Sequence, residues 1–450
     1  MNKKILYYIW LSSTLSPGSK TAKLVLEHFG DIEKVYNAEK EDFEAISISG
    51  NDLVCLCNKN LDNAEHYYKY CVSKNIGILC YDNPYYPERL KIIDNPPPMF
   101  YYQGKLLGLD DYPCITMVGT RSCSERGFRL AYESGFNMAL KGGVVVNGLA
   151  LGIDGACISG ALDAGGYAIG VLGCGIDRIY PFGNKDIFER LAGCGLIITE
   201  FPPFSAPKNT NFPVRNRVMS ALSLATVVLE ADTNSGAMIT ARHALQQGRR
   251  IFAVPAKPYD KTYSGALELI KDGATVFTEA EDVLLEYSMS FPHRINLAKK
   301  RDLPVDKLSR YVATYFKKDV DPDEPVNRRF IDTIKAKTKK KGENLETAKE
   351  KEAIPKPSPT KVEPSKNVTE NTPSAVRQES VITDDAASVD LSTLSETELK
   401  IYNIIKDGKS LTADEIADKG IKIDDVLSAL TLLEIYGHVC AKPGGKYEII

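Results

Sequence analysis

Hydrophobic and polar positions alternate in one regular pattern between about residues 113 and 290. Short, continuous apolar runs are separated by segments in which apolar residues recur at helical spacing. Apolar runs of this kind predict strands buried on both faces, and helical crossovers between them predict a parallel sheet. We therefore expect an α/β fold with a Rossmann-like doubly wound parallel sheet. The predicted strands are 115–118, 144–146, 168–172, 196–199, 226–229 and 251–254.

The N-terminal residues 1–75 have a different, all-helical pattern, typical of a small SAM-like or helix-hairpin-helix-like domain. The stretch 15–20, Leu-Ser-Pro-Gly-Ser-Lys, is similar to a hairpin whose backbone N–H groups hold a phosphate. The second glycine of such hairpins is absent, so a plain helical bundle is an equal alternative. Residues 76–112, rich in Pro and Tyr, are expected to form a connector.

Residues 291–390 are expected to form a disordered linker. The part from 331 to 390 contains no aromatic residue and is rich in Lys, Glu, Pro, Ser and Thr, so it cannot offset its chain entropy by apolar burial. A helical pattern returns at 391–450 and ends in a predicted hairpin, which indicates a winged-helix domain. Acidic residues outnumber lysines there, which favours a protein-binding role over a DNA-binding one.

Composition limits the partners and the compartment. The chain has 450 residues and a net charge of −3, so a nucleic-acid site would have to be local. The ten cysteines form no C-x-x-C pair and do not cluster with the five histidines, so we expect no metal site. Most of them stand in apolar surroundings, which favours a reducing, cytoplasmic location, and no apolar run reaches the length of a membrane span.

Candidate chemistry gathers in the residues that follow the predicted strands. Gly119-Thr120-Arg121-Ser122 follows the first strand and Asn147-Gly148 the second. In parallel sheets ligands bind at the carboxyl ends of the strands, and glycine lets a ligand approach the backbone. The stretch 207–245 adds Lys208, Phe212, two arginines and a Ser-Gly at a helix start, where free N–H groups attract anions. A phosphate-bearing ligand fits this combination.

Several enzyme classes are disfavoured by motif. The glycines lack the dinucleotide-binding spacing, and neither a P-loop nor a nucleophile elbow is present. The remaining enzyme alternative is a nucleotide phosphoribohydrolase of the lysine-decarboxylase-like Rossmann group. Those enzymes carry a catalytic glutamate three residues after a Gly-Thr turn, and the comparable stretch 235–240 is followed by His243. Without that carboxylate, binding is favoured over catalysis, and we expect neither catalytic residues nor a cofactor.

The motifs together resemble those of the bacterial DNA-processing protein A (DprA/Smf) family. They are MVGTRS (117–122), NGLALGIDGA (147–156), RIYP (178–181), the stretch 199–223 with its FP-x-RNR core, NSGAMITARHALQQGR (234–249) and IFAVP (251–255). The resemblance implies a homodimeric protein that binds and protects single-stranded DNA and loads the RecA recombinase in natural transformation. Asn147, Cys157 and Ala256 depart from the family pattern of Ser, His and Gly at these positions.

The resemblance also implies the DNA-binding residues. They are Gly119, Thr120, Arg121, Asn147, Gly148, Lys208, Asn209, Phe212, Arg215, Asn216, Arg217, Ser235, Gly236 and Thr240. Arginines and a ring are the groups that hold a single strand, through phosphates and stacked bases. One of Arg215 and Arg217 is expected instead to pair with Asp154 or Glu200 inside the domain, and the sequence does not distinguish which.

Overall fold

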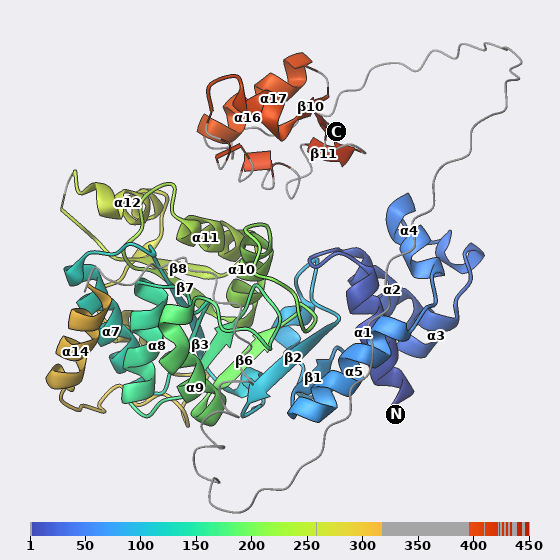
Figure 1. The fold of residues 1–450 in the computed structure, drawn as a ribbon. Helices are drawn as coiled ribbons and strands as arrows, with labels where there is room; N and C mark the ends of the chain where they lie inside the picture. Colours follow the sequence, from blue (N-terminus) through green and yellow to red (C-terminus); the bar gives the residue numbers. More distant parts are fainter. Residues whose placement is uncertain are drawn as a thin grey trace, which may run out of the picture. The chain divides into compact units, whose positions relative to one another are not determined.

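The computed structural model describes residues 2–257, 259–316, 396–408, 410–421 and a subset of positions between 423 and 449. These belong to two compact units, Met1–Lys335 and Ala336–Ile450. The first unit contains a nine-stranded sheet and most of the helices (Figure 1).

The large sheet has the strand order β1-β2-β6-β5-β4-β3-β7-β8-β9. From β6 to β9 all neighbouring strands are parallel, and β1 and β2 extend the sheet in antiparallel pairing. The predicted strands are all present, as β3 (Cys114–Val118), β4 (Val144–Asn147), β5 (Ala168–Val171), β6 (Leu196–Thr199), β7 (Ala225–Val228) and β8 (Arg250–Ala253). The predicted α/β class and doubly wound parallel sheet are therefore confirmed.

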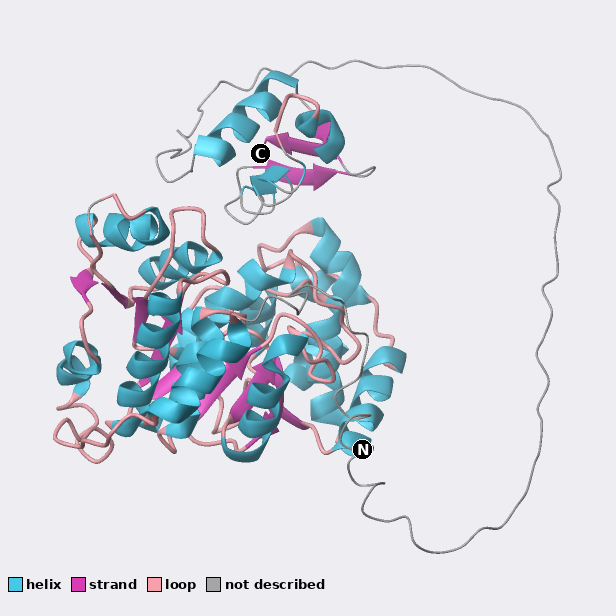
Figure 2. Cartoon of the chain, turned by 60° about the vertical axis from the view of Figure 1, so that its left-hand side comes forward, coloured by secondary structure: helices cyan, strands magenta, loops and turns pink. Residues whose placement is uncertain are grey.

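Two layers of helices cover the sheet (Figure 2). One face packs against α7 (Glu125–Leu140), α8 (Ile153–Asp163), α9 (Lys185–Cys194) and α13 (Ala280–Tyr287). The other packs against α10 (Asn211–Leu222), α11 (Gly236–Gln246) and α12 (Ser264–Lys271). Alternation along β3 explains the division, because Ile115 and Met117 enter the first core while Cys114 and Val118 enter the second.

The N-terminal residues are helical, as expected. The helices are α1 (Lys3–Thr14), α2 (Thr21–Phe29), α3 (Ile32–Asn37), α4 (Gly50–Cys57) and α5 (Asp62–Lys74). Their buried residues, Trp10 among them, join the core that lies between the sheet and α7–α9. The helical segment therefore packs directly on the sheet.

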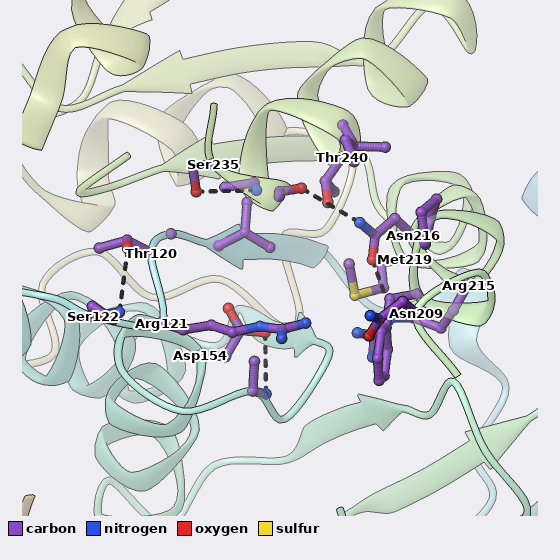
Figure 3. A pocket seen from close by; sticks show the side chains of 18 residues that line it. Thr120, Arg121, Ser122, Asp154, Asn209, Arg215, Asn216, Met219, Ser235 and Thr240 are labelled. Carbon is purple, nitrogen blue, oxygen red and sulfur yellow. Dashed lines mark hydrogen bonds between the residues drawn. The ribbon is translucent and has the colours of Figure 1, made fainter. Parts of the chain in front are cut away.

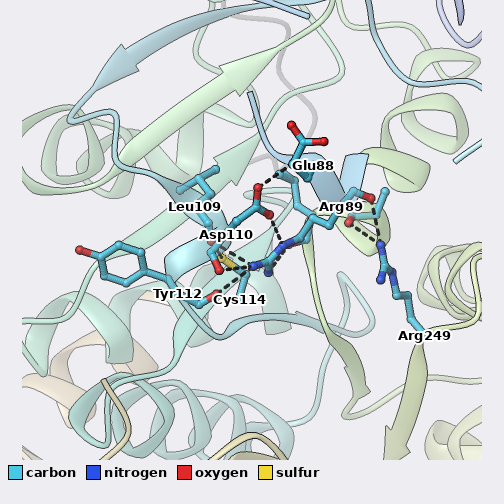
Figure 4. Close-up of polar contacts among 9 residues, drawn as sticks. Glu88, Arg89, Leu109, Asp110, Tyr112, Cys114 and Arg249 are labelled. Atoms are coloured by element: carbon cyan, nitrogen blue, oxygen red, sulfur yellow. Dashed lines mark hydrogen bonds and ion pairs between the residues drawn. The ribbon is translucent and has the colours of Figure 1, made fainter. Parts of the chain in front are cut away.

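The expectation of a connector over 76–112 is wrong. This stretch supplies β1 (Gly77–Cys80), α6 (Glu88–Lys91) and β2 (Met99–Gly104), and β2 pairs with β6. Arg89 fixes it to the sheet domain (Figure 4). Its buried guanidinium donates to the carbonyls of Leu109, Asp110, Tyr112 and Leu222, the last at the end of α10, and pairs with the Asp110 carboxylate at 2.8 Å.

The linker predicted to start at residue 291 starts later than expected. Residues 291–316 include α14 (Val305–Tyr315), which packs on α7 through the buried Leu308 and Val312. Upstream of it, the buried Lys141 ammonium donates to the carbonyls of Leu297 and Lys299 at 3.0 and 3.2 Å. Backbone carbonyls of a stretch that was expected to be disordered and solvated are thus hydrogen-bonded to the sheet domain. The rest of the predicted linker, 317–390, lies outside the described residues.

In the second unit the described elements are α16 (Glu396–Gly408), α17 (Ala413–Ala417), β10 (Leu411–Thr412), β11 (Val439–Lys442) and β12 (Lys446–Ile449). β12 lies between β10 and β11, antiparallel to both, so the expected hairpin strands are present. The turn of that hairpin and much of the helix predicted over 424–436 lie outside the described residues, and the winged helix stays a prediction.

Remaining short elements complete the first unit. β9 (Thr275–Val276) pairs in parallel with β8 and forms the sheet edge.

In the described part of the chain, no helix combines the length and apolarity that a membrane span requires.

Candidate nucleic-acid interface

The candidate site lies beside β3, where the direction in which successive strands are added to the sheet reverses. After β3 the chain adds β4, β5 and β6 on one side of it, then returns to add β7 and β8 on the other. Crossovers on opposite sides leave a crevice at the carboxyl ends of the strands at this switch point. A cavity of about 380 Å³ opens there, between the end of β3 and the beginnings of α8, α10 and α11.

Two helix N-termini line the cavity. Phe212 and Pro213 belong to the first turn of α10, which Asn209 precedes, and Ser235, Gly236 and Ala237 belong to the start of α11. Ser235 caps α11 by accepting a hydrogen bond from the Ala237 N–H at 3.3 Å. The first N–H groups of a helix have no partner within the helix, and its dipole places partial positive charge at that end. This side of the cavity is therefore suited to anions.

Arg121 supplies the exposed cation of the site. Its side chain reaches across the cavity toward the residues of α10 (Figure 3). The guanidinium carbon is 5.1 Å from the centroid of the Phe212 ring, and among the described residues the side chain makes no ion pair. The Phe212 ring in turn stacks on Tyr180, with centroids 5.6 Å apart and an interplanar angle of 19°. An unpaired cation beside stacked rings can take a phosphate and a base together.

Arg215 is buried at the floor of the cavity. Its Nη1 donates to the Gly148 carbonyl at 2.9 Å and to the Val171 carbonyl, and its Nε donates to the Asn216 amide oxygen at 3.1 Å. A Cβ on Gly148 would lie 2.4 Å from this guanidinium, so any larger residue would displace it. Burial lowers the pKa of Arg215 to about 10, which still leaves it charged at neutral pH. Arg215 thus joins the 147–148 loop to α10 while adding positive charge beneath the cavity.

Asp154 is the one carboxylate that lines the cavity in the described part of the chain. Its Oδ2 accepts hydrogen bonds from the backbone N–H groups of Gly148 and Ala150 at 3.1 and 3.4 Å. Burial raises its pKa to about 6, although Arg215 and those N–H groups favour the charged form. The site therefore contains a carboxylate that changes protonation near physiological pH.

Ten of the fourteen predicted residues line the cavity. They are Gly119, Thr120, Arg121, Asn209, Phe212, Arg215, Asn216, Ser235, Gly236 and Thr240. Gly148 borders an adjoining smaller cavity with Tyr180. Asn147 is buried, and its side chain holds the loop by donating to the Asp154 carbonyl and accepting from the Leu149 N–H. Lys208 is exposed and stands just before the Asn209 that lines the cavity, so its place at the rim stays a prediction.

The structure shows which of the two buried α10 arginines forms the internal ion pair, and Arg217 does not line the cavity with the other predicted DNA-binding residues. Arg217 is 3% exposed, and its Nη2 pairs with the Glu200 carboxylate at 2.6 Å. The Gly18 turn packs closely against α10, because a Cβ on Gly18 would lie 3.1 Å from Val214 and 3.4 Å from the Nε of Arg217. The N-terminal turn that resembles a phosphate-binding hairpin therefore lies against the arginine of the Arg217–Glu200 pair.

Sequence reasoning missed Asp154, which lines the cavity, and Tyr180, which lines the adjoining smaller cavity. From the sequence, Asp154 is expected only to pair with an arginine, and Tyr180 appears only within the RIYP motif. Tyr180 precedes a cis proline, Pro181, in the loop after β5, and the position of its ring depends on tertiary packing. The available signal for this carboxylate was its place in the motif NGLALGIDGA (147–156), which follows the predicted strand 144–146.

The enzyme alternative gains no support from the geometry. His243, which occupies the position of the hydrolases' catalytic glutamate, is not among the residues lining the cavity. Burial lowers its pKa to about 4, so it is neutral at pH 7 and offers neither a carboxylate nor a cation. Among the described residues there is also no cluster of His, Cys, Asp and Glu suited to a metal ion.

Comparison with known proteins identifies the family. Residues 77–288 match the family model described as DNA recombination-mediator protein A. Protein Smf of Synechocystis is 33% identical over 316 residues, which cover 69% of this chain and 79% of that protein. The crystal structure of DNA processing protein A from Streptococcus pneumoniae aligns with a TM-score of 0.55 and 28% identity, covering 64% of this chain and 98% of that one. The chain belongs to the bacterial DNA-processing protein A (DprA/Smf) family.

Proposed function

We propose that the cavity at the switch point binds single-stranded DNA, and that the protein uses it to protect incoming strands and to load the RecA recombinase. The observation that carries this proposal is the position of Arg121, an exposed cation beside the stacked rings of Phe212 and Tyr180. The helix N-termini of α10 and α11 add partial positive charge for the backbone phosphates. Stacking on these rings requires unpaired bases, which favours a single strand over a duplex.

We further propose that the protein acts as a homodimer and that the winged-helix region binds a protein. The late sheet edge around residues 264–277, which contains β9, is the candidate dimer surface, because an unpaired edge strand offers free backbone groups. These proposals rest on the family and on the acidic character of residues 391–450.

Equilibrium titration of labelled single-stranded and double-stranded oligonucleotides tests the proposal, combined with an assay for free base released from nucleoside monophosphates. We expect tight binding of the single strand, weak binding of the duplex and no base release. Release of free base that depends on Asp154 would support the phosphoribohydrolase alternative and contradict the proposal.

Affinity for single strands should rise as the pH falls from 8 to 5.5. The carboxylate of Asp154 has a pKa of about 6, and a phosphate in the cavity raises that pKa further, so DNA binding takes up a proton. Asp154→Asn keeps an oxygen for the Gly148 N–H and removes the charge. At pH 8 the variant should bind single strands about three- to tenfold more tightly than the wild type. Its affinity should no longer depend on pH.

The matched control is Asp272→Asn, which neutralises an exposed carboxylate that does not line the cavity. Fluorescence anisotropy at constant ionic strength measures both variants. If Asp154→Asn retained the full pH dependence of the wild type, another group would be titrating.

A further inference from the structure

The backbone of the turn that carries Arg121 forms hydrogen bonds with three other segments of the chain. The Thr120 N–H donates to the Glu230 carbonyl at 2.7 Å, at the end of β7. The Thr120 carbonyl accepts from the Ile153 N–H at 3.2 Å, at the start of α8. The Arg121 carbonyl accepts a hydrogen bond from the phenolic hydroxyl of Tyr315. The first two partners lie within the family-matched residues 77–288, but Tyr315 lies beyond them.

Tyr315 is itself held firmly. Tyr315 is the last residue of α14. The centroid of its ring lies 5.0 Å from the centroid of the Phe128 ring in α7. The middle of α14 is anchored by Tyr311, whose hydroxyl accepts from Arg190 at 3.0 Å. Its start is anchored by Lys307, which pairs with the Asp163 carboxylate at 3.4 Å.

The segment before α14 is anchored as well. Arg301 donates to the Asp163 carbonyl at 2.7 Å, and its guanidinium lies 4.9 Å from the centroid of the Phe136 ring. Asn296 donates its N–H to the Lys141 carbonyl at 2.9 Å. Residues 291–316 therefore follow the α7–α8 surface as a docked segment and end beside the Arg121 turn.

We propose that this docked segment positions the DNA-binding turn, and that Tyr315 is the residue through which it acts. The proposal rests on the proposed function and extends it, because it adds a positioning residue that the family-matched region does not contain. An exposed arginine binds a phosphate with a small entropy loss only if its backbone is already fixed. Tyr315 fixes the carbonyl of Arg121 itself, so loss of its hydroxyl should loosen the turn and leave the fold in place.

The test is a double-mutant cycle in the full-length chain, with single-strand affinity and melting temperature measured on each variant. Tyr315→Phe removes the hydroxyl and keeps the ring packed on Phe128. It should weaken binding about three- to tenfold, the range expected for one hydrogen bond. In the Arg121→Ala background the same substitution should have little effect, because the side chain that it positions is gone.

Thr314→Val is the matched control. It removes a hydroxyl from the same helix that bonds only to the Arg310 carbonyl within α14, and it leaves the Arg121 carbonyl and the anchors of the docked segment untouched, so affinity should match the wild type. Equal losses from Tyr315→Phe and Thr314→Val would overturn the inference, as would a Tyr315→Phe loss that persists in the Arg121→Ala background. Normal binding by Tyr315→Phe while Arg121→Ala binds weakly would overturn it and leave the proposed function standing. A wild type that fails to bind single strands would overturn both.

Discussion

Arg217→Met should lower the free energy of unfolding by about 3–5 kcal/mol, the typical cost of leaving one partner of a buried ion pair alone. The substitution keeps the length of the side chain and removes its charge, so Glu200 remains buried at 5% exposure without its cation. In the pair as it stands, the Nε and Nη1 of Arg217 have no partner among the described residues. The ion pair at Nη2 is therefore the polar contact that the substitution removes.

Single-strand binding by the folded variant should be unchanged, because Arg217 does not line the cavity. Urea unfolding measures the stability, and anisotropy measures the affinity at a temperature where the variant is folded. The double variant Arg217→Met with Glu200→Leu should recover most of the lost stability, since replacing both charges removes the unpaired carboxylate. Retained stability with weakened DNA binding would show that Arg217 is a DNA ligand.

The Arg217–Glu200 pair also lies beside the N-terminal turn that resembles a phosphate-binding hairpin. Burial raises the pKa of Glu200, and Arg217 together with the Gly18 N–H offsets this by stabilising its charged form. Asn95 donates to the Gly18 carbonyl at 3.0 Å and holds the same turn from the other side. The helical N-terminal segment thus contacts α10, the helix that carries Phe212 and Arg215, at Val214 and Arg217.

The parallel strands were predictable because each is buried on both faces and therefore reads as a continuous apolar run. β1 and β2 were not, because they lie among prolines and tyrosines and their pairing with β6 is a long-range contact. α14 was missed for a related reason. Its stretch is rich in charge, and its order depends on distant partners such as Asp163 and Phe128.

The candidate site was predictable in outline and ambiguous in detail. Arg121 could be placed because ligands gather after the strands of a parallel sheet. Arg215 and Arg217 could not be distinguished, because residues two apart point about 200° apart around a helix and the sequence does not say which side faces the cavity. The RNR motif therefore contains one buried arginine at the floor of the cavity and one in an internal ion pair with Glu200.

Arg121→Ala should weaken single-strand binding about tenfold or more, the range for a charge-assisted hydrogen bond to a phosphate. Arg121 is exposed and makes no ion pair among the described residues, so its loss leaves no buried charge and the fold should survive. For single strands each phosphate contact contributes about −0.7 to the slope of log K against log salt. The slope should become shallower by roughly that amount, regardless of base sequence. Arg126→Ala, at an exposed arginine in the first turn of α7 outside the cavity, is the matched control.

The most direct measurement of the central claim is the salt dependence of single-strand affinity for the wild type, Arg121→Ala and Arg126→Ala, with the melting temperature taken on the same samples. If the cavity binds DNA phosphates through Arg121, only Arg121→Ala loses affinity and has a shallower slope, and its melting temperature equals that of the wild type. An unchanged slope with a lowered melting temperature would contradict the claim, because it would show that Arg121 stabilises the fold and does not bind DNA.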